Sequence, residues 1–511
     1  MQRRLGQVPR GDGLLTHNLL DEDKAPQDAC GVVGIWAPGE DVSRLAYFSL
    51  YALQHRGQES AGIAVSNGDR IFVIKEMGLV AQVFNEEALN ALTGHIAVGH
   101  TRYSTTGASS WHNAQPTFRS TSVGHIALGH NGNLTNTPAL AQVLRATERD
   151  FGSGTGPLST SDTDVLTGLI AAAATGDLME AAATVLPTVE GAYSLVFCDE
   201  ATLYAARDPQ GIRPLSIGKL PNGWAVASET AALDIIGAEF VRDVEPGEII
   251  AIDADGLRSK IFAQPRAKGC LFEFVYLARP DSSIRNRVVH QARVDVGRRL
   301  ALAAPVDADL VIPVPESGTP AAIGYAQSSG IPFAQGFVKN SYVGRTFIQP
   351  NQTIRQLGIR LKLNPLKEVI AGRRLVVVDD SIVRGNTQRA IVKMLREAGA
   401  AEVHVRISSP PVKWPCFYGI DFATRGELVA NALDVEGVRE AIGADSLAYV
   451  SLEELTEAVN IPADELCRAC FDGIYPISPP EAANIDAHQL DLLTPSVDPV
   501  SEDLSHALRL P

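Results

Sequence analysis

The chain has 511 residues, more than one hydrophobic core usually organises, so we expect two large domains. Its 45% hydrophobic and 20% charged residues are typical of a globular protein. The formal net charge of −15 disfavours sequence-independent binding to nucleic acid or to an anionic membrane. No apolar stretch approaches the length of a membrane span. We therefore expect neither a nucleic-acid-binding protein nor a membrane protein, while a local phosphate site is compatible with this charge.

The first 29 residues contain no apolar run of the length that a signal peptide requires. We therefore expect a cytoplasmic protein. Six cysteines in so long an intracellular chain are too sparse for a disulfide scaffold and suggest metal-binding or catalytic roles. They are Cys30, Cys198, Cys270, Cys416, Cys467 and Cys470.

Between Cys30 and about residue 255, short apolar segments alternate with turns that contain glycine, which predicts mostly antiparallel strands. These segments are 96–105, 125–136, 192–200, 202–218, 223–229 and 247–252. Helical patterns interrupt them, as at Thr137, a predicted N-cap, and Pro138, a predicted first helical residue. The first half therefore predicts layered α and β structure around antiparallel sheet.

From about residue 285, strand-like and helical segments alternate, which predicts right-handed crossovers and a parallel sheet. The helical segments are 288–304, 321–330 and 387–400, and the strand-like ones are 309–315, 373–380 and 402–408. Ligands of such a domain bind at the carboxyl ends of the strands. After Pro476 the chain becomes polar and rich in proline, so we expect a mostly disordered acidic tail over 477–511.

The most informative local signal is RRLVVVDDSIVRGNTQRA, residues 373–390. A buried strand runs into two carboxylates, then into a loop with Ser381 and Gly385, then into a helix. A glycine turn at a helix N-terminus presents N–H groups to an anion, while Asp379 and Asp380 can hold sugar hydroxyls or Mg²⁺. Paired aspartates before a helix are more often simple caps, but the whole ordered pattern predicts a site for a sugar phosphate with a metal.

This pattern resembles the binding motif of type I phosphoribosyltransferases, which use phosphoribosyl pyrophosphate. The resemblance implies that VIPVPESGTPAA, residues 311–322, receives the pyrophosphate, and that Mg²⁺, one per subunit, lies at Ser317, Asp379 and Asp380. The implied phosphoribosyl pyrophosphate ligands are Asp379, Asp380, Ser381, Arg384, Gly385, Asn386, Thr387, Glu316, Ser317, Gly318 and Lys339. The basic segment 339–366 is either a mobile lid or a solvated loop.

Four motifs in the first half, LQHRGQES, HTRYST, HNGNLTN and TSDTDV, follow CGVVGIW at Cys30. Together they resemble the glutaminase domain of N-terminal-nucleophile amidotransferases. A terminal cysteine supplies both a thiol nucleophile and an α-amine base, since the pKa of that amine lies near 8, so cleavage before Cys30 is required. The resemblance implies that Asn131 and Gly132 form the oxyanion hole, that Arg102 binds the glutamine carboxylate and that Asp162 binds its ammonium. Taken singly, the same residue types are usually turns, caps or surface ion pairs.

The remaining cysteines include the pair in CRAC, which suits metal ligation or redox chemistry, while Cys198 reads as a buried thiol in a strand. From Cys30 to about Pro476 the chain resembles the glutamine phosphoribosylpyrophosphate amidotransferase family. In one branch of that family a propeptide occurs with one [4Fe–4S] cluster per subunit. This resemblance assigns the cluster to Cys270, Cys416, Cys467 and Cys470, with tetrahedral zinc as the chemical alternative.

The resemblance implies a propeptide over 1–29, an αββα glutaminase domain over 30–260 and an α/β phosphoribosyltransferase domain over 261–476. It also implies that ammonia from glutamine displaces pyrophosphate from phosphoribosyl pyrophosphate, giving 5-phosphoribosylamine for purine synthesis. A homotetramer inhibited by purine nucleotides is expected on the same basis. The alternatives are another amidotransferase, such as a glucosamine-6-phosphate or asparagine synthase, and a non-catalytic nucleotide sensor that keeps the phosphoribosyl fold.

Overall fold

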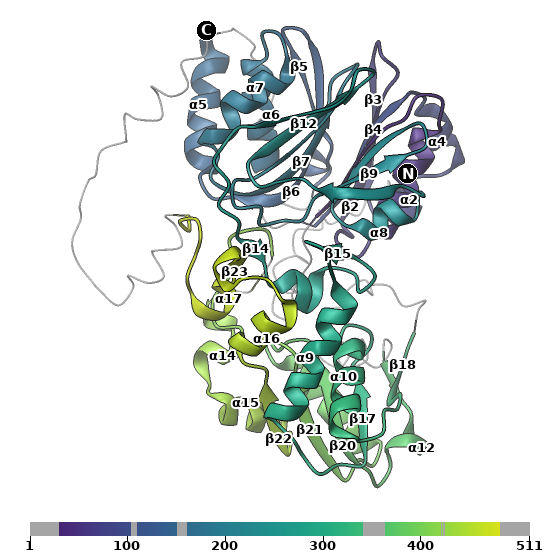
Figure 1. The fold of residues 1–511 in the computed structure, drawn as a ribbon, viewed down its shortest axis with the longest axis vertical. Coiled ribbons are helices and arrows are strands. Elements are labelled where there is room, and N and C mark those ends of the chain that lie inside the picture. The colour runs from purple at the N-terminus through teal and green to yellow at the C-terminus, as the bar shows by residue number, and fades with distance from the viewer. Residues whose placement is uncertain are drawn as a thin grey trace, which may run out of the picture. The chain divides into compact units, whose positions relative to one another are not determined.

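The computed structural model describes residues 30–103, 110–150, 161–340, 363–420, 422 and 425–480, without the side chains of 148–150. The predicted propeptide, residues 341–362 of the predicted lid and the tail beyond 480 lie outside these residues. The described chain forms two compact units (Figure 1). The first, here called the antiparallel unit, comprises 30–292, 414–420, 422 and 456–480, and the second, the parallel unit, comprises 293–340, 363–413 and 425–455.

The first sheet of the antiparallel unit has the strand order β11-β9-β10-β1-β4-β2-β3. Its strands are β1 (Gly31–Trp36), β2 (Ser60–Ser66), β3 (Ile71–Met77), β4 (Ile96–Arg102), β9 (Ser216–Leu220), β10 (Gly223–Ala227) and β11 (Glu239–Asp243). The second sheet has the order β13-β12-β8-β7-β6-β5. Its strands are β5 (Thr117–Thr121), β6 (Gly124–Leu134), β7 (Gly191–Cys198), β8 (Leu203–Arg207), β12 (Glu248–Asp253) and β13 (Gly256–Ile261). All neighbours in both sheets are antiparallel.

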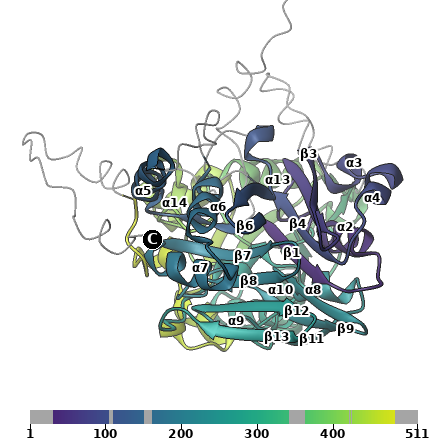
Figure 2. The same cartoon turned by 90° about the horizontal axis from the view of Figure 1, so that it is seen from above.

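Helices cover the outer face of each sheet, so the layers follow the order αββα (Figure 2). One group is α2 (Val42–Ala52), α3 (Val80–Val83), α4 (Glu86–Ala91) and α8 (Thr230–Asp234), and the other is α5 (Thr137–Asp150), α6 (Asp162–Ala173) and α7 (Leu178–Val185). Apolar side chains of both inner faces form the central core, including Val32, Val98 and Val196. The sheets pack so closely that a Cβ at Gly34 would lie 2.4 Å from Val196.

Besides the sandwich, the antiparallel unit contains short elements, three of which carry later cysteines. Strands β14 (Gly269–Cys270) and β23 (Leu466–Cys467) pair in parallel, and α17 (Ala469–Asp472) follows directly (Figure 1). The other short elements are the π-helix η4 (Glu273–Leu277), β15 (Ser283–Ile284), β16 (Arg287–Val288), and the 3-10 turns η2 (Trp111–Asn113), η3 (Leu186–Thr188) and η6 (Ala463–Glu465). The sequence predicted one boundary after residue 260, whereas the two units interleave, because 414–420, 422 and 456–480 belong to the antiparallel unit.

The parallel unit is built on a parallel sheet of order β17-β20-β21-β22. Its strands are β17 (Leu310–Pro313), β20 (Arg374–Asp379), β21 (Glu402–Ile407) and β22 (Ser446–Tyr449), with the antiparallel pair β18 (Phe337–Lys339) and β19 (Leu363–Pro365) beside them. The helices are α10 (Thr319–Ser329), α12 (Lys367–Ile370), α13 (Asn386–Glu397), α14 (Val429–Ala432) and α15 (Val435–Ile442), with the 3-10 turn η5 (Arg425–Glu427). Two further helices, α9 (Val289–Ala303) and α16 (Leu452–Val459), cross the boundary between the two units. Buried aliphatic residues such as Val377, Ile391 and Val405 form its core.

The fold class predicted from the sequence is confirmed. The predicted strand at 192–200 is β7, every residue of which is buried, and the predicted strand at 373–380 is β20. Thr137 differs by one position, because it is already the first residue of α5 rather than its N-cap. Among the described residues, no helix combines the length and apolarity needed to cross a membrane.

Candidate active sites

Cys30 lies directly before β1 and is only 7% exposed. Its Sγ receives a hydrogen bond from the Tyr103 N–H at 3.4 Å and donates to the Tyr103 carbonyl at 3.3 Å. Burial raises the pKa of the thiol to about 11, although the Tyr103 main chain and the Arg102 charge act to lower it. Asp162 and Glu59 raise the same pKa, so three charged groups act on this sulfur. The thiol is therefore protonated at neutral pH and needs a base before it can attack.

Two of the predicted glutamine ligands lie near this thiol. Arg102 ends β4, is 3% exposed, and its Nη1 lies 3.7 Å from Glu59 Oε2. Asp162 begins α6, where its carboxylate accepts the N–H groups of Thr163 at 2.7 Å and Leu134 at 3.1 Å. A helix N-terminus stabilises a carboxylate at this position. The structure thus brings one buried cation and one buried anion to the same thiol, as recognition of an amino acid requires.

The predicted oxyanion residues lie on β6. Asn131 is fully buried, its Nδ2 lies 3.4 Å from Ser228 Oγ, and no described group bonds its Oδ1. Ser228 Oγ also accepts the Val32 N–H at 3.0 Å, so one hydroxyl joins the nucleophile's strand to Asn131. Gly132 has φ +152°, and a Cβ there would lie 2.0 Å from the Ala192 carbonyl. Only glycine fits this position without displacing β7.

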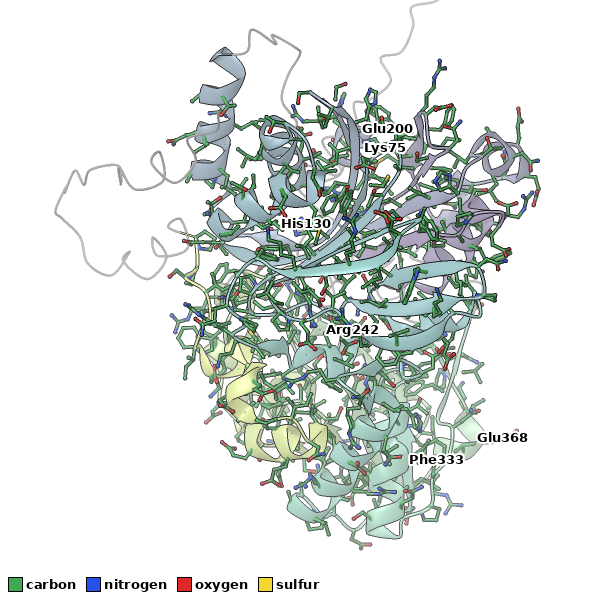
Figure 3. The ribbon with its side chains drawn as sticks, turned by 45° about the horizontal axis from the view of Figure 1, so that its top comes forward. Lys75, His130, Glu200, Arg242, Phe333 and Glu368 are labelled. Carbon is green, nitrogen blue, oxygen red and sulfur yellow. The ribbon has the colours of Figure 1, made fainter. Side chains whose placement is uncertain are left out.

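Two histidines support the same stretch of β6. His130, labelled in Figure 3, accepts a hydrogen bond at its carbonyl from His100 Nε2 at 3.0 Å. Its own Nδ1 lies 3.2 Å from Thr163 Oγ1 and 3.7 Å from Asp162 Oδ2. Burial lowers the pKa of His100 to about 3, so that ring is neutral at physiological pH. Main-chain position at 130–132 is therefore set by interior hydrogen bonds.

In the parallel unit, Asp379 and Asp380 lie at the carboxyl end of β20 and are both buried. Asp380 accepts hydrogen bonds from the hydroxyls of Ser317 and Ser381 at 2.5 Å each. Asp379 accepts the Asp380 N–H at 2.9 Å and is also bonded by Gln388 Nε2. Burial raises the pKa of both carboxyls, and the Asp380 charge raises that of Asp379 further. Two carboxylates and two hydroxyls thus converge, the oxygen donors that Mg²⁺ prefers.

Glycines shape the loops around these carboxylates. Gly385 precedes α13 with φ +81°, a left-handed conformation that favours glycine. Gly318 precedes α10, and a Cβ there would lie 2.5 Å from the Val378 carbonyl, so it permits close approach to β20. Both loops present a helix N-terminus at the carboxyl edge of the sheet, where anions bind.

The other predicted phosphoribosyl ligands are more open to solvent. Asn386 and Thr387 are exposed in the first turn of α13. Arg384 Nη2 lies 3.5 Å from Glu427 Oε2, and Lys339 Nζ lies 3.4 Å from Glu316 Oε2. Lys339 and Glu316 are 46% and 76% exposed and so are open to a ligand, whereas the Arg384 side chain is only 15% exposed.

The four predicted cluster cysteines line one small cavity in the antiparallel unit, together with Arg213 and Tyr418. Cys270 and Cys467 are paired residues of β14 and β23, and Cys416 Sγ accepts the Tyr418 N–H at 3.4 Å. Burial raises the pKa of Cys270 to about 11 and also raises that of Cys467 and Cys470. Cys198 lies apart from them, fully buried in β7 as predicted. Among the described residues, no three His, Cys, Asp or Glu side chains are arranged to hold a single metal ion.

Sequence reasoning missed Ser228, Gln388 and the buried arginines. Arg213 and Arg56 are fully buried, and both bond the carboxylate of Glu273. Arg56 could have been found from its place in LQHRGQES, whereas Arg213 and Ser228 lie in the strand segments 202–218 and 223–229, which contain no recognisable motif.

Comparisons with known proteins cover both units. Residues 100–234 match the glutamine amidotransferase domain family, and residues 290–408 match the phosphoribosyl transferase domain family. The amidophosphoribosyltransferase of Mycobacterium tuberculosis (strain ATCC 25618 / H37Rv) is 63% identical over 478 residues, which are 91% of this chain and 90% of the relative. That of Bacillus subtilis (strain 168) is 45% identical, over 90% of this chain and 96% of the relative.

A solved structure is similar over nearly the same length. It is glutamine phosphoribosylpyrophosphate amidotransferase from B. subtilis, complexed with ADP and GMP, with a TM-score of 0.82 and 44% identity. The match covers 88% of this chain and 98% of that one.

Proposed function

Because the chain belongs to the amidophosphoribosyltransferase family, whose members use glutamine to aminate phosphoribosyl pyrophosphate in purine biosynthesis, we propose that Cys30 is its glutaminase nucleophile. The observation that carries this proposal is the buried Cys30 thiol, on which Arg102 and Asp162 both act electrostatically. Glutamine needs such a cation and anion for its α-carboxylate and α-ammonium.

Glutamine hydrolysis follows from the groups around Cys30. Its α-amine takes the thiol proton, and Sγ bonds to the carboxamide carbon while the carbonyl electrons move to oxygen. The side chain of Asn131 and the N–H of Gly132 stabilise that oxyanion. The ammonium of Cys30 then returns the proton to the leaving nitrogen, the C–N bond breaks, and ammonia departs. Water hydrolyses the remaining thioester to glutamate and free Cys30.

The parallel unit consumes this ammonia. The ammonia nitrogen bonds to C1 of phosphoribosyl pyrophosphate as the C1–O bond to pyrophosphate breaks, and loss of a proton leaves 5-phosphoribosylamine. The Asp379 carboxylate binds ribose hydroxyls, and the loop from Ser381 to Thr387 binds the 5-phosphate through N–H and hydroxyl donors. The pyrophosphate group is bound by Glu316, Gly318 and Lys339. Ser317, Asp379 and Asp380 would hold Mg²⁺, which would supply positive charge to the leaving pyrophosphate.

We also propose that the four cavity cysteines hold a [4Fe–4S] cluster. Four sulfurs around one cavity support it, since each thiolate of such a cluster binds a different iron and need not share one ion with the others. The cluster supplies cross-links between segments far apart in the chain and no step of the reaction. The enzyme is further proposed to be a cytoplasmic homotetramer inhibited by purine nucleotides, in keeping with the ADP and GMP bound by the B. subtilis protein.

The glutaminase proposal is tested by glutamate release from purified enzyme with glutamine, with and without phosphoribosyl pyrophosphate. Glutamate should appear, and faster when the second substrate is present, because binding at one site is coupled to the other. Absence of glutamate under both conditions contradicts the proposal.

Two compositional measurements test the remaining parts. The intact mass should correspond to a chain that begins at Cys30, and an active chain with residues still preceding Cys30 contradicts the α-amine base. Anaerobic elemental analysis should find iron and sulfide in equal amounts, whereas zinc without sulfide contradicts the cluster.

A further inference from the structure

We propose that the segment Trp414–Ile420, here called the cysteine loop, positions the oxyanion hole through contacts with Gly132 and Asn133. This inference rests on the proposed role of Asn131 and Gly132 and adds Gly419 and Asn133 as positioning residues. Neither residue touches glutamine in this account. Both act by fixing the main chain that does.

The cysteine loop contacts two successive residues of β6. Asn133 Nδ2 donates a hydrogen bond to the Phe417 carbonyl at 3.0 Å, across 284 residues of sequence. Gly419 has φ +104°, and a Cβ there would lie 3.1 Å from both the Cα and the carbonyl carbon of Gly132. On another side, a Cβ on Gly132 would lie 2.0 Å from the Ala192 carbonyl of β7. Gly132 therefore lies between β7 and the cysteine loop: a Cβ on Gly132 would overlap β7, and a Cβ on Gly419 would push against the Gly132 main chain.

A buried ion network holds the cysteine loop in place. Arg213 donates from Nε and Nη2 to the Tyr418 carbonyl, at 2.9 and 2.8 Å. Its Nη1 donates to Glu273 at 3.1 Å, and Glu273 also accepts a hydrogen bond from Arg56 at 2.6 Å. All three charged side chains are at most 2% exposed. Because breaking one partner of a buried ion pair leaves an uncompensated charge, the Tyr418 carbonyl has little freedom to move.

The same network reaches a second wall of the glutamine site. Arg56 is followed by Gly57, where a Cβ would lie 2.5 Å from the carbonyl carbon of Thr101 and 2.7 Å from the Arg102 nitrogen. The network thus extends from the cysteine cavity, which Arg213 lines, to the main chain beside the glutamine carboxylate ligand. The network should affect Gly132 more strongly than Arg102, because the cysteine loop lies directly against Gly132.

Displacing the cysteine loop should therefore slow one step, the addition of the Cys30 thiol to the glutamine carboxamide. The oxyanion forms only as the thiol adds to the carbonyl, so misplaced donors lower kcat for glutamine without weakening ground-state binding. Ammonia-dependent synthesis needs no oxyanion hole and should be unaffected.

The test compares Gly419→Ala with Gly256→Ala in purified holoenzyme. Gly256 has φ +106° but no atom within 4 Å of its missing Cβ, so this control carries the same backbone strain without the contact. Gly419→Ala should lower glutamine-dependent kcat by about tenfold or more, with KM for glutamine unchanged, since loss of a whole oxyanion donor costs about 10²–10³ in kcat. Gly256→Ala should keep wild-type values. Equal kcat in the two variants contradicts the inference.

A second readout does not depend on turnover. 6-Diazo-5-oxo-norleucine alkylates a glutaminase thiol: its diazo carbon takes a proton, N₂ leaves, and a C–S bond forms. Mass spectrometry of Cys30 labelling should give a slower limiting rate in Gly419→Ala at the same half-saturating concentration. If Gly419→Ala does not fold, Asn133→Ala, which removes the bond to Phe417, decides by the same two measurements. If Asn131→Ala also retains the wild-type kcat, the oxyanion hole has been assigned to the wrong residue. If Asn131→Ala has a lower kcat while Gly419→Ala and Asn133→Ala keep the wild-type kcat, only the positioning role of the cysteine loop is contradicted.

Discussion

The glutamine site and the phosphoribosyl site differ in how they are held. Around Cys30, the proposed ligands Arg102 and Asn131 lie on strands β4 and β6 and are 3% and 0% exposed, and Asp162 is buried at the start of α6. Around Asp379, most ligands lie on loops, and the Glu316 side chain is 76% exposed. Stabilising an oxyanion requires donors fixed before the reaction, while binding a sugar phosphate requires loops that a ligand can enter. Substitutions in one site or the other should therefore have separable effects on the two activities.

The largest effect is expected at the phosphoribosyl site. Asp380→Asn should lower synthesis from either glutamine or ammonia by about a hundredfold or more, because the proposed Mg²⁺ would lose an anionic ligand. The same substitution should raise the melting temperature of metal-free enzyme. Burial raises the pKa of both adjacent carboxyls, so their charges oppose folding at neutral pH and removing one relieves that cost.

Asp309→Asn is the matched control for this pair of measurements. Asp309 bonds Arg374 at the opposite end of β20, at 2.9 Å. Asp309→Asn should leave both the glutamine-dependent and the ammonia-dependent synthesis unchanged. A loss of activity with Asp309→Asn as large as with Asp380→Asn would show that the effect is general to the sheet.

Arg102→Lys should act on binding in the glutamine site. A lysine keeps the charge but loses the planar fork, so KM for glutamine should rise by about 10- to 100-fold while ammonia-dependent activity stays constant. Arg119→Lys, which alters a partly buried pair with Asp164 in the same unit, serves as the control. Steady-state kinetics with glutamine and with ammonia measure both values. An unchanged KM for glutamine in Arg102→Lys would contradict the proposed role of Arg102 in binding the glutamine carboxylate.

Ser228→Ala should lower kcat for glutamine by about tenfold, because Asn131 loses the hydroxyl that joins it to β1. Ser216→Ala removes an equally buried hydroxyl, bonded to Asp243 in the same sheet. The two variants should lose similar thermal stability. Only Ser228→Ala should have a lower glutaminase kcat. Equal kcat values in the two variants would show that Ser228 has a structural role only.

The smallest effect concerns pH. Burial lowers the pKa of His100 to about 3, against 6.5 when unfolded, so the unfolded chain binds more protons between these values. Stability should therefore be full above pH 6.5 and fall by at most about 1.4 kcal/mol per pH unit below it. His100→Gln should flatten this slope in denaturant titrations at several pH values, whereas the exposed His112→Gln should not.

Much of the fold could be predicted from local pattern. Apolar runs such as 192–200 and 373–380 became β7 and β20, because a buried strand needs only continuous apolar residues and turn signals at its ends. Site residues inside motifs, such as Asp379 or Arg102, could be named because each motif keeps its residues a few positions apart.

The contacts that complete the site could not be predicted in this way. Ser228 reaches Asn131 across 97 residues, and Phe417 reaches Asn133 across 284. Neither segment has a periodicity that points to its partner, since such contacts depend on how sheets and loops pack. The interleaving of the two units has the same origin.

Whether Cys30 serves glutamine hydrolysis alone can be measured in Cys30→Ala supplied with amide-¹⁵N glutamine and unlabelled ammonia. Wild type should form phosphoribosylamine that carries ¹⁵N. Cys30→Ala should form only the unlabelled product, at the wild-type ammonia-dependent rate. Labelled product from Cys30→Ala would contradict the account, as would loss of ammonia-dependent synthesis in a folded variant.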